Sequence, residues 1–475
     1  MDKIAKLIIP ILIVSVYFVG LSLPLIGPDE PRYAQVAREM FQRSDLITPT
    51  LGGFEWFEKP PLLYWLQMLS YKMFGVSEFS ARLGSTIFGL LTILSLSILV
   101  KITTNDAKLT RLVALILSTS IGLIVFAHGA SFDIILTFPI TASLSSFFIA
   151  FYFSEHEKIE KALIALFVFY FFMGVSVLAK GLVGLVIGFG TIFLFFILAR
   201  KIPPKSFFLT FPFGILICVL VMAIWYLPMY QLHGWRFVDE FIIQHHFERY
   251  TSNKYLHPQP FWFFWLVLPI MTIPWTPFFL ASIWDFLKNF REKGQLEVFA
   301  FSWMITLLVF FSFSGSKLPG YILPALPAAA FLTAKFIFEK RVNWINPLAS
   351  VTALLVIVFG TFFAEDVLRH ETTKHFIEKA DRLGYKDAKI LNLHTISHNL
   401  EFYGAGRLVR ETNGKQRYFY GSAEVEQFMR LNGEREVLVI VPPRYENDLI
   451  ENTSLKSEKL DENNEYAFFV VKLVE

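Results

Sequence analysis

Charged residues that could carry out chemistry are concentrated in one loop near the N-terminus, between Gly27 and Pro61. The loop reads Gly-Pro-Asp-Glu-Pro-Arg-Tyr at 27–33 and Phe-Glu-Lys-Pro-Pro at 57–61. Proline fixes the backbone around these carboxylates and cations, and a lysine suits a phosphate as a point charge. The loop follows an apolar run, so its residues indicate a reaction at a membrane surface. The simpler interpretation is that Asp29 or Glu30 only caps a helix at 32–43.

Two more ionisable residues stand beside long apolar runs. Asp133 opens one such run shortly after His128, and Lys180 is a lone cation inside another. An ionised carboxylate at a membrane costs a few kcal/mol, about 2.5 to 3.5, unless it is paired or hydrated. Asp133 could therefore be a functional group or a helix cap. Lys180 could bind an anion, or its side chain could extend to the membrane surface.

Histidines and a further cation occur in two later connections. The segment 244–250 reads Gln-His-His-Phe-Glu-Arg-Tyr, and the segment 316–321 reads Ser-Lys-Leu-Pro-Gly-Tyr. Adjacent helical histidines diverge by about 100 degrees and cannot easily share one metal. One of them could still join Glu58 as a metal ligand, with water or substrate completing the shell.

Most of the chain belongs in a membrane, because 54% of its 475 residues are hydrophobic. About eleven crossings are predicted from the apolar runs. Basic residues recur in alternate connections, which places those connections in the cytoplasm and the candidate residues on the opposite face. The short apolar segment 61–75 would break this alternation and is predicted to form surface helices. The predicted spans lie near 5–25, 79–100, 111–127, 133–153, 162–179, 181–199, 206–229, 260–283, 297–313, 318–337 and 344–364.

Residues 365–475 have the character of a small α/β domain outside the membrane, after a membrane domain at 1–364. A helix at 366–384, a strand at 389–393, a helix at 423–431 and strands at 436–441 and 466–474 are predicted. No Gly-rich phosphate loop occurs there, so docking or covering the site is its simplest role. A single cysteine excludes disulfides. The sequence contains neither a block of basic residues nor an RNA-reading motif, so it does not indicate a nucleic acid partner.

Taken together, these motifs resemble the lipid A aminoarabinose transferases, which belong with the protein O-mannosyltransferases in the GT-C glycosyltransferase superfamily. The resemblance covers roughly residues 1–364 and implies an all-α polytopic GT-C fold of about 11 to 13 transmembrane helices. It also implies a small C-terminal periplasmic α/β domain. Trp56 departs from the family pattern, which tends to have tyrosine there, and this leaves the sugar open.

The resemblance implies roles for individual residues. Asp29 and Asp133 match catalytic or polar positions of the cavity, and Glu58 and His246 match a divalent metal pair, zinc in the related enzyme, with a structural role. No nucleotide cofactor is expected. The positions that match groups binding the donor phosphate are Lys59, Arg32, Arg249, Tyr33, Tyr321 and Lys180.

The implied function is transfer of a sugar from a polyprenyl-phosphate donor to lipid A or its core, at the periplasmic face of a bacterial inner membrane. Cations would stabilise the departing lipid phosphate, and single displacement with inversion is expected because no second carboxylate is placed as a nucleophile. Aminoarabinose or galacturonic acid is the expected sugar. A protein O-mannosyltransferase is the alternative within the enzyme class. A lipid-linked-sugar transporter and an assembly protein that recruits a partner are the other classes.

Overall fold

The computed structural model describes residues 3–248, 259–342 and 344–474, which form two compact units. The predicted boundary after Ala364 lies close to Val358, where the last segment of the second unit begins. The second unit also takes in most of the first loop, so this loop packs with the C-terminal domain. The first unit is Met1–Val19, Phe57–Leu66 and Arg82–Ile357, and the second is Gly20–Trp56, Gln67–Ala81 and Val358–Glu475.

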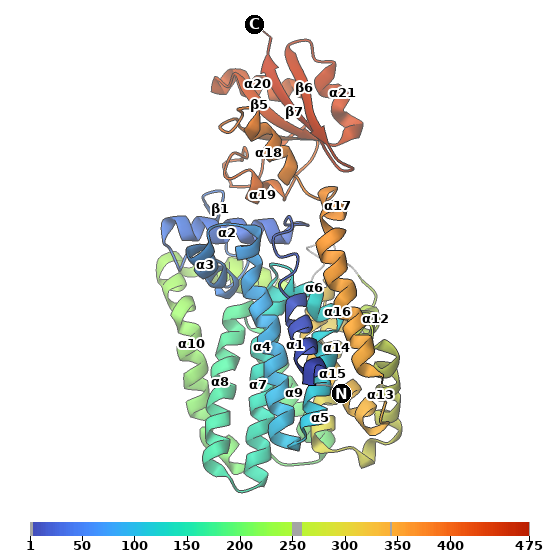
Figure 1. The fold of residues 1–475 in the computed structure, drawn as a ribbon. Coiled ribbons are helices and arrows are strands. Elements are labelled where there is room, and N and C mark those ends of the chain that lie inside the picture. The colour runs from blue at the N-terminus through green and yellow to red at the C-terminus, as the bar shows by residue number, and fades with distance from the viewer. Residues whose placement is uncertain (1–2, 249–258, 343, 475) are drawn as a thin grey trace. The chain divides into compact units, whose positions relative to one another are not determined.

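The first unit is a helical bundle (Figure 1). Its helices follow the predicted apolar runs, because a run of about 20 apolar residues can satisfy its backbone only as a helix in a membrane. They are α1 Lys3–Val16, α4 Glu78–Thr104, α5 Ala107–Ser118, α6 Ile121–Ala127, α7 Phe132–Glu155, α8 Ile159–Lys180, α9 Val183–Ala199, α10 Lys205–Phe237, the π-helix η1 Val238–Glu248, α12 Phe263–Met271, α13 Thr276–Lys288, α14 Gln295–Ser312, α15 Leu326–Glu339 and α16 Ile345–Phe362, with the 3-10 helices η2 Phe290–Glu292 and η3 Pro319–Ala325.

Among the described residues, 7 helices are long and apolar enough to cross a membrane. The pair α5 and α6 would make an eighth span, although it bends by 59° at the break, and α9 is a shorter apolar helix. The predicted number of about eleven crossings therefore stays a prediction.

Besides the run at 111–127, which is divided into α5 and α6, two further predicted spans are not continuous helices. The run at 5–25 forms a helix only to Val16, and the following turn contains Gly20 with a φ of 79°. The run at 260–283 is broken between α12 and α13, where Pro274 cannot supply a backbone N–H to continue the helix. The carbonyl of Ile273 at this break accepts a hydrogen bond of 2.8 Å from the N–H of Ile121 in α6 instead.

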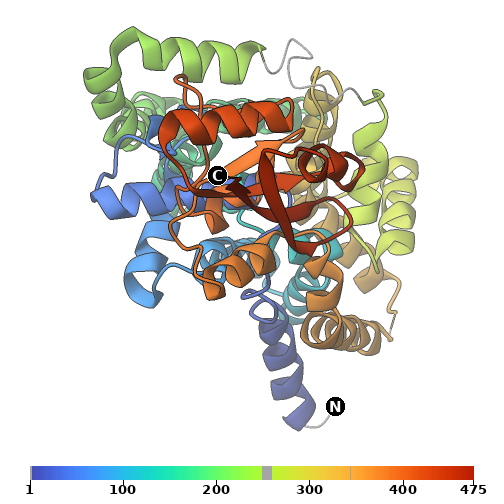
Figure 2. The same cartoon turned by 90° about the horizontal axis from the view of Figure 1, so that it is seen from above.

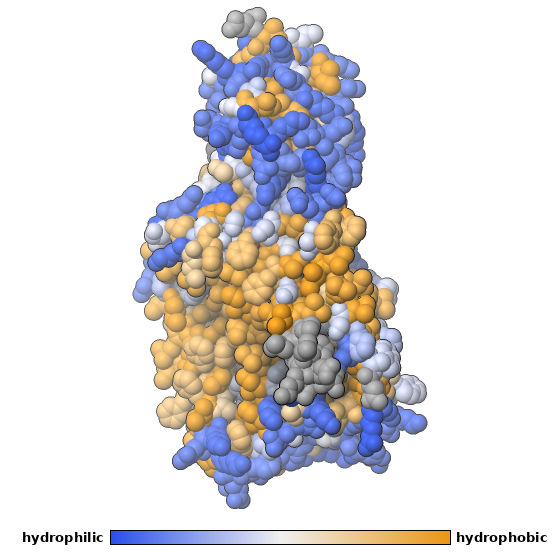
Figure 3. All heavy atoms as spheres, viewed as in Figure 1, coloured by the Kyte–Doolittle hydropathy of each residue, from blue (hydrophilic) through white to orange (hydrophobic). Residues whose placement is uncertain are grey.

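The core of the bundle lies around α7. Of its most apolar stretch, 89% is buried, against 17% for the corresponding stretch of α10. Phe147 of α7 packs its ring against a set of phenylalanines from the neighbouring helices: Phe169, Phe196, Phe207 and Phe299. Hydrophobic side chains cover the helical body on the face shown in Figure 3, whereas the C-terminal domain carries mostly hydrophilic ones. The outer helices thus present the surface that lipid requires.

Basic connections gather at one end of the bundle, as the charge alternation predicts. Lys201 after α9 forms an ion pair with Glu155 at the end of α7. Lys293 before α14 lies 2.6 Å from Asp285 of α13, and Lys340 after α15 lies 4.0 Å from the same carboxylate. The contacts of Lys201 and Lys340 each join two connections that the sequence assigns to one side of the membrane, whereas Lys293 pairs within its own connection.

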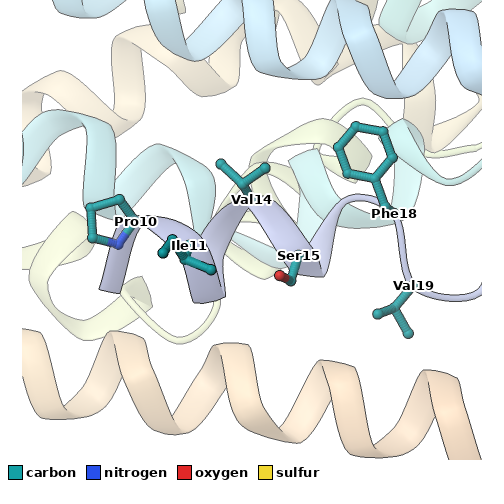
Figure 4. A pocket seen from close by; sticks show the side chains of 6 residues that line it. All are labelled: Pro10, Ile11, Val14, Ser15, Phe18 and Val19. Carbon is teal, nitrogen blue, oxygen red and sulfur yellow. The ribbon is translucent and has the colours of Figure 1, made fainter. Parts of the chain in front are cut away.

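Helix α1 lies at the periphery of the bundle (Figures 1 and 2). A groove of about 560 Å³ runs along it, lined by Pro10, Ile11, Val14, Ser15, Phe18 and Val19 (Figure 4). A second groove of about 1620 Å³ separates α1 from α4 and α5. None of the predicted site residues lines either groove, so neither opening belongs to the candidate site.

The second unit combines the first loop with the C-terminal domain. The predicted helix at 32–43 is confirmed as α2, which begins at Asp29. The segment 61–75 is helical as predicted and forms the single helix α3, whereas its position on the membrane surface stays a prediction. The first-loop elements are α2 Asp29–Arg43, β1 Thr50–Leu51, β2 Phe54–Glu55 and α3 Leu62–Phe74, of which the first turns of α3 lie in the first unit. The first turn of α4 and the last residues of α16 belong to the second unit. The C-terminal elements are α17 Ala364–Arg369, α18 Lys374–Arg382, β3 Ile390–Leu393, α19 Leu400–Tyr403, β4 Tyr418–Phe419, α20 Ser422–Asn432, β5 Glu436–Val441, η4 Pro443–Tyr445, α21 Glu446–Ile450, β6 Leu455–Glu462 and β7 Ala467–Leu473.

The C-terminal sheet has the strand order β4-β3-β5-β7-β6. Strands β4, β3 and β5 are parallel, whereas β7 runs antiparallel to both β5 and β6. The α/β character and three of the strands are as predicted. The predicted helix at 366–384 is wrong as one element, because a break at 370–373 divides it into α17 and α18. Strand β6 escapes prediction because its charged sequence lacks a regular apolar alternation.

Candidate functional site

The first cluster of candidate residues lies at the start of α2. Pro28 is the residue before the helix, and neither Asp29 nor Glu30 caps it, so the capping interpretation is wrong. Both carboxylates instead lie in the first helical turn. The Arg32 guanidinium donates to Oδ1 of Asp29 at 2.6 Å and, through Nε, to the carbonyl of Pro28 at 2.8 Å. The ion pair is thus fixed to the rigid proline segment.

The two side chains of this ion pair differ in their exposure to solvent. The Asp29 side chain is 49% exposed, against 18% for Arg32, whose guanidinium lies 5.8 Å from the centre of the Trp56 ring. Asp29 is therefore the more accessible member of the pair. Tyr33, predicted to lie beside the donor, is only 4% exposed and belongs to the packed face of α2.

The second cluster is the turn that contains Glu58 and Lys59. Nζ of Lys59 lies 2.9 Å from Oε1 of Glu58, and both side chains are nearly buried. The preceding Phe57 packs against His233, with ring centres 4.8 Å apart, and against Phe237 at 6.0 Å. The end of α10 thereby holds this turn in place, so that the lysine charge has a fixed position.

The third cluster joins three helix ends that are distant in sequence. Asp133, near the start of α7, forms an ion pair with Lys180, the last residue of α8. Nζ of Lys180 also lies 4.6 Å from the centre of the Tyr321 ring in η3. The interpretation that Lys180 only extends to the membrane surface is therefore wrong. The alternative that Asp133 caps α7 is also wrong, because Ser131 caps this helix and accepts from the N–H of Asp133 at 3.1 Å.

Gly320 permits the close approach of η3 to this ion pair. A Cβ at position 320 would lie 1.9 Å from Oδ2 of Asp133, which no side chain could occupy. The absence of a side chain therefore lets the backbone beside Tyr321 rest directly on the carboxylate.

The predicted metal pair cannot be completed from the described residues. The side chain of His246 and all of Arg249 lie outside what the structure describes. Among the described residues, no group of three or more histidine, cysteine, aspartate or glutamate side chains could hold a metal ion. Glu58 has two carboxylate oxygens, of which Oε1 is paired with Lys59. Metal binding therefore stays a prediction.

Two cations near the predicted residues had no role in the sequence analysis: Lys317 was noted there only as the cation of the segment 316–321, and Arg236 was not noted. Lys317 is 7% exposed and donates to the carbonyls of Ser314 at 2.7 Å and Gln259 at 3.1 Å. Arg236 lies 5.5 Å from the centre of the Phe57 ring. The signal for Lys317 was its place four residues before Tyr321. No sequence signal marked Arg236 as a site residue, because it lies at the end of an apolar helix without a recognisable motif.

In each cluster a cation is held against a carboxylate, at helix ends in the first and third clusters and in the turn before α3 in the second. Charges fixed in this way need no reorganisation when a charged transition state forms. In the membrane unit, both lysines of these pairs are less than one-fifth exposed, so their fields are screened less than those of surface charges. Such cations can stabilise a leaving phosphate, and a reachable carboxylate can act on an acceptor.

Comparison with known proteins shows which proteins this chain resembles. The family model described as dolichyl-phosphate-mannose-protein mannosyltransferase matches residues 16–238. An uncharacterized protein of Aquifex aeolicus is 30% identical over 76% of this chain and 69% of its own length. The undecaprenyl phosphate-alpha-4-amino-4-deoxy-L-arabinose arabinosyl transferase of Wigglesworthia glossinidia brevipalpis is 29% identical over 79% of this chain and 66% of its own length.

A solved structure shows the same fold. The crystal structure of ArnT from Cupriavidus metallidurans bound to undecaprenyl phosphate has a TM-score of 0.83, with 20% identity, covering 99% of this chain and 98% of that chain. The chain spans about two thirds of the length of the curated relatives. It is a multi-pass membrane protein, and it belongs to the GT-C glycosyltransferase family of the lipid A aminoarabinose transferases.

Proposed function

We propose that the protein transfers a sugar, aminoarabinose in the first instance, from a polyprenyl-phosphate donor to lipid A. It works in the bacterial inner membrane with its site and C-terminal domain on the periplasmic face. The observation that carries the proposal is the set of fixed carboxylate–cation pairs at helix ends and in the turn before α3, in a chain of this family. The relatives named for transfer from undecaprenyl phosphate support the choice of donor.

The reaction is a single displacement. An oxygen of the acceptor forms a bond to the anomeric carbon while the bond from that carbon to the donor phosphate oxygen breaks, and the phosphate leaves with the electron pair. Lys59, Arg32 and Lys180 supply positive charge to that leaving group. Asp29 orients the acceptor and, where the acceptor is a hydroxyl, takes its proton. Attack from the face opposite the leaving group inverts the anomeric centre.

The positions of the charges argue against a transporter. A transporter places ionisable residues at mid-membrane depth, along a substrate pathway. Here Asp133 is the second residue of α7 and Lys180 is the last residue of α8. Both charges therefore stand at helix ends, where a surface reaction needs them.

Mass spectrometry of lipid A tests the function directly. Lipid A from cells that carry the gene should show the added sugar, and lipid A from cells without it should not. Purified protein should transfer the sugar from undecaprenyl-phosphate-linked aminoarabinose to lipid A in detergent. Unchanged lipid A in both assays would reject the proposal.

Protein O-mannosyl transfer is the second candidate, because the matching family model is that of the protein mannosyltransferases. The same purified protein should then mannosylate serine or threonine in an acceptor peptide from a polyprenyl-phosphate-mannose donor. Offering lipid A and peptide acceptors in parallel separates the two candidates.

Lys59→Ala is expected to weaken binding of undecaprenyl phosphate. Loss of a charged hydrogen bond to the phosphate costs about 1.5 to 3 kcal/mol, which is a factor of about 10 to 150 in affinity. Lys59→Arg should restore part of the affinity, because the charge returns with a different shape. Affinity can be measured by isothermal titration in detergent, and parent-like binding by both variants would leave Lys59 as a structural partner of Glu58.

Zinc is expected to copurify with the protein and to depend on Glu58 and His246. A zinc ion between them would order the loops that carry them, so its removal should lower thermal stability and donor affinity before the rate. Elemental analysis of the parent, Glu58→Gln, His246→Ala and His245→Ala decides the question. Loss of metal from Glu58→Gln and His246→Ala alone would support the pair. Loss of metal from His245→Ala would instead identify His245 as the ligand. Absence of metal from the parent protein would end the proposal.

A further inference from the structure

The C-terminal domain contacts the part of the first loop that carries Asp29 and Arg32. The two contacting parts are separated by more than 300 residues in sequence but belong to one compact unit. Three sets of contacts join them, at the entry to α2, along α2 and at the β1–β2 hairpin that follows it.

The entry to α2 is held by Tyr403 of α19. Its hydroxyl accepts a hydrogen bond of 2.7 Å from the N–H of Leu25 and donates to Oε1 of Glu78 at 3.3 Å. The same carboxylate oxygen lies 2.7 Å from Nζ of Lys374 in α18. The backbone just before Pro28 is thus tied to the C-terminal domain through a charged network.

The middle of α2 is held by Phe402, the neighbour of Tyr403. Nη1 of Arg38 donates to the carbonyl of Phe402 at 3.0 Å, and the guanidinium lies 4.0 Å from the centre of the Phe402 ring. Burial lowers the pKa of Arg38 from its ordinary value. A desolvated guanidinium is costly unless it is hydrogen-bonded, so this contact fixes the helix against rotation.

The β1–β2 hairpin is contacted by α2 on one side and by the C-terminal domain on the other. From α2, Oε1 of Glu39 accepts from the N–H of Gly52 at 2.7 Å, and Oε2 accepts from the N–H of Gly53 at 3.0 Å. From the C-terminal domain, the side chain of Arg410 lies so close that a Cβ on Gly52 would be 1.9 Å from its Nε. Arg410 is itself held by an ion pair with Glu401 of α19, a carboxylate only 3% exposed.

We propose that α19 and Arg410 set the position of α2, so that the C-terminal domain serves as a positioning device for Asp29 and Arg32. The proposal rests on the catalytic role given to these residues under the proposed function. Misplacement of a reacting group by about 1 Å can lower a rate on the order of 10²-fold, so a rigid anchor on α2 has a direct catalytic use. A domain that merely docked a partner would need none of these contacts with the loop.

Two neighbouring glycines provide a matched test. Gly52 and Gly53 have φ values of 64° and 83°, so alanine strains the backbone at both positions. Alanine at 52 would also collide with Arg410, whereas a Cβ at 53 meets nothing within 4 Å. We expect Gly52→Ala to lower kcat tenfold or more relative to Gly53→Ala, with KM for the lipid-linked donor within about twofold.

Removing the Arg410 side chain should remove the additional loss of kcat that Gly52→Ala causes. In the double variant Gly52→Ala/Arg410→Ala, kcat should be lower than in Arg410→Ala alone by no more than the factor that separates Gly53→Ala from the parent, which shows that the two positions act through one contact. Arg38→Lys should lower kcat less than Arg38→Met, because charge and one donor are kept while stacking is lost.

Hydrogen exchange makes the result independent of the assigned activity. Amides of α2 should exchange faster in Gly52→Ala than in Gly53→Ala, while those of α7 and α8 stay the same in both. If the parent transfers no sugar, the proposed function fails and the exchange data still test the anchor. Equal kcat and equal exchange in the two glycine variants would overturn the inference.

Discussion

Asp29→Asn is expected to abolish sugar transfer while the protein folds and binds its donor. The amide keeps the size of the side chain and can still accept from Arg32, but it can neither take a proton nor offer a full negative charge. General acid–base and electrostatic contributions of a positioned carboxylate are worth roughly 10² to 10⁴ in rate, so kcat should fall by about that factor. A turnover assay with a fixed donor and increasing acceptor measures it.

Glu30→Gln is the matched control for this change. Glu30 is the next residue and carries the same charge, but its Oε2 accepts a hydrogen bond of 3.1 Å from the N–H of Ile26. A glutamine oxygen can accept that bond, so activity should stay within a few-fold of the parent. If both variants turn over like the parent, the carboxylate at 29 is not catalytic, and if both are inactive, the helix start rather than the charge is essential.

Lys180→Met should be the most destabilising of the single substitutions at the site. It leaves the carboxylate of Asp133 without its partner, and that side chain is only 17% exposed. Breaking one side of a buried ion pair costs about 3 to 5 kcal/mol, whereas replacing both charges is often neutral. The double variant Asp133→Asn/Lys180→Met should therefore recover most of the thermal stability in detergent, although it should not recover transfer.

Lys201→Met serves as the comparison for Lys180→Met. Its ion pair with Glu155 lies at the other end of α7, with side chains 36% and 31% exposed. Pairs exposed to this extent contribute about 0 to 1 kcal/mol, so the melting temperature should change little. Equal losses from the two lysine variants would mean that the Asp133–Lys180 pair is not a special buried contact.

Much of the membrane unit could be predicted from the sequence, because apolar runs and basic connections act locally. The start of α7 and the end of α8 placed Asp133 and Lys180 on the same face, but not in contact. Their ion pair depends on how α7 packs along α8 and on the lack of a side chain at Gly320. Since α7 and α8 are apolar on all sides, their hydropathy gives the depth of a residue but not the face of the helix that it occupies.

The grouping of the first loop with the C-terminal domain could not be predicted at all. It depends on single hydrogen bonds such as that from Arg38 to the carbonyl of Phe402, across 364 residues of sequence. A backbone carbonyl acceptor cannot be recognised from the type of residue, because every residue has one. The capping prediction at Asp29 failed for a related reason, since Pro28 already fixes the backbone at the helix start, and the two carboxylates accept from Arg32 and from the N–H of Ile26 instead.

The outermost strands of the C-terminal sheet bear on how these proteins behave when crowded together in a membrane. An uncovered strand edge invites pairing with a second molecule and hence aggregation. One edge here is β4, only 2 residues long, and the other is β6, with the sequence Leu-Lys-Ser-Glu-Lys-Leu-Asp-Glu and an irregularity between Lys459 and Asp461. Short length, alternating charge and a bulge each discourage a neighbouring sheet from adding a strand. The domain can therefore be present at high density without cross-linking its neighbours into fibrils.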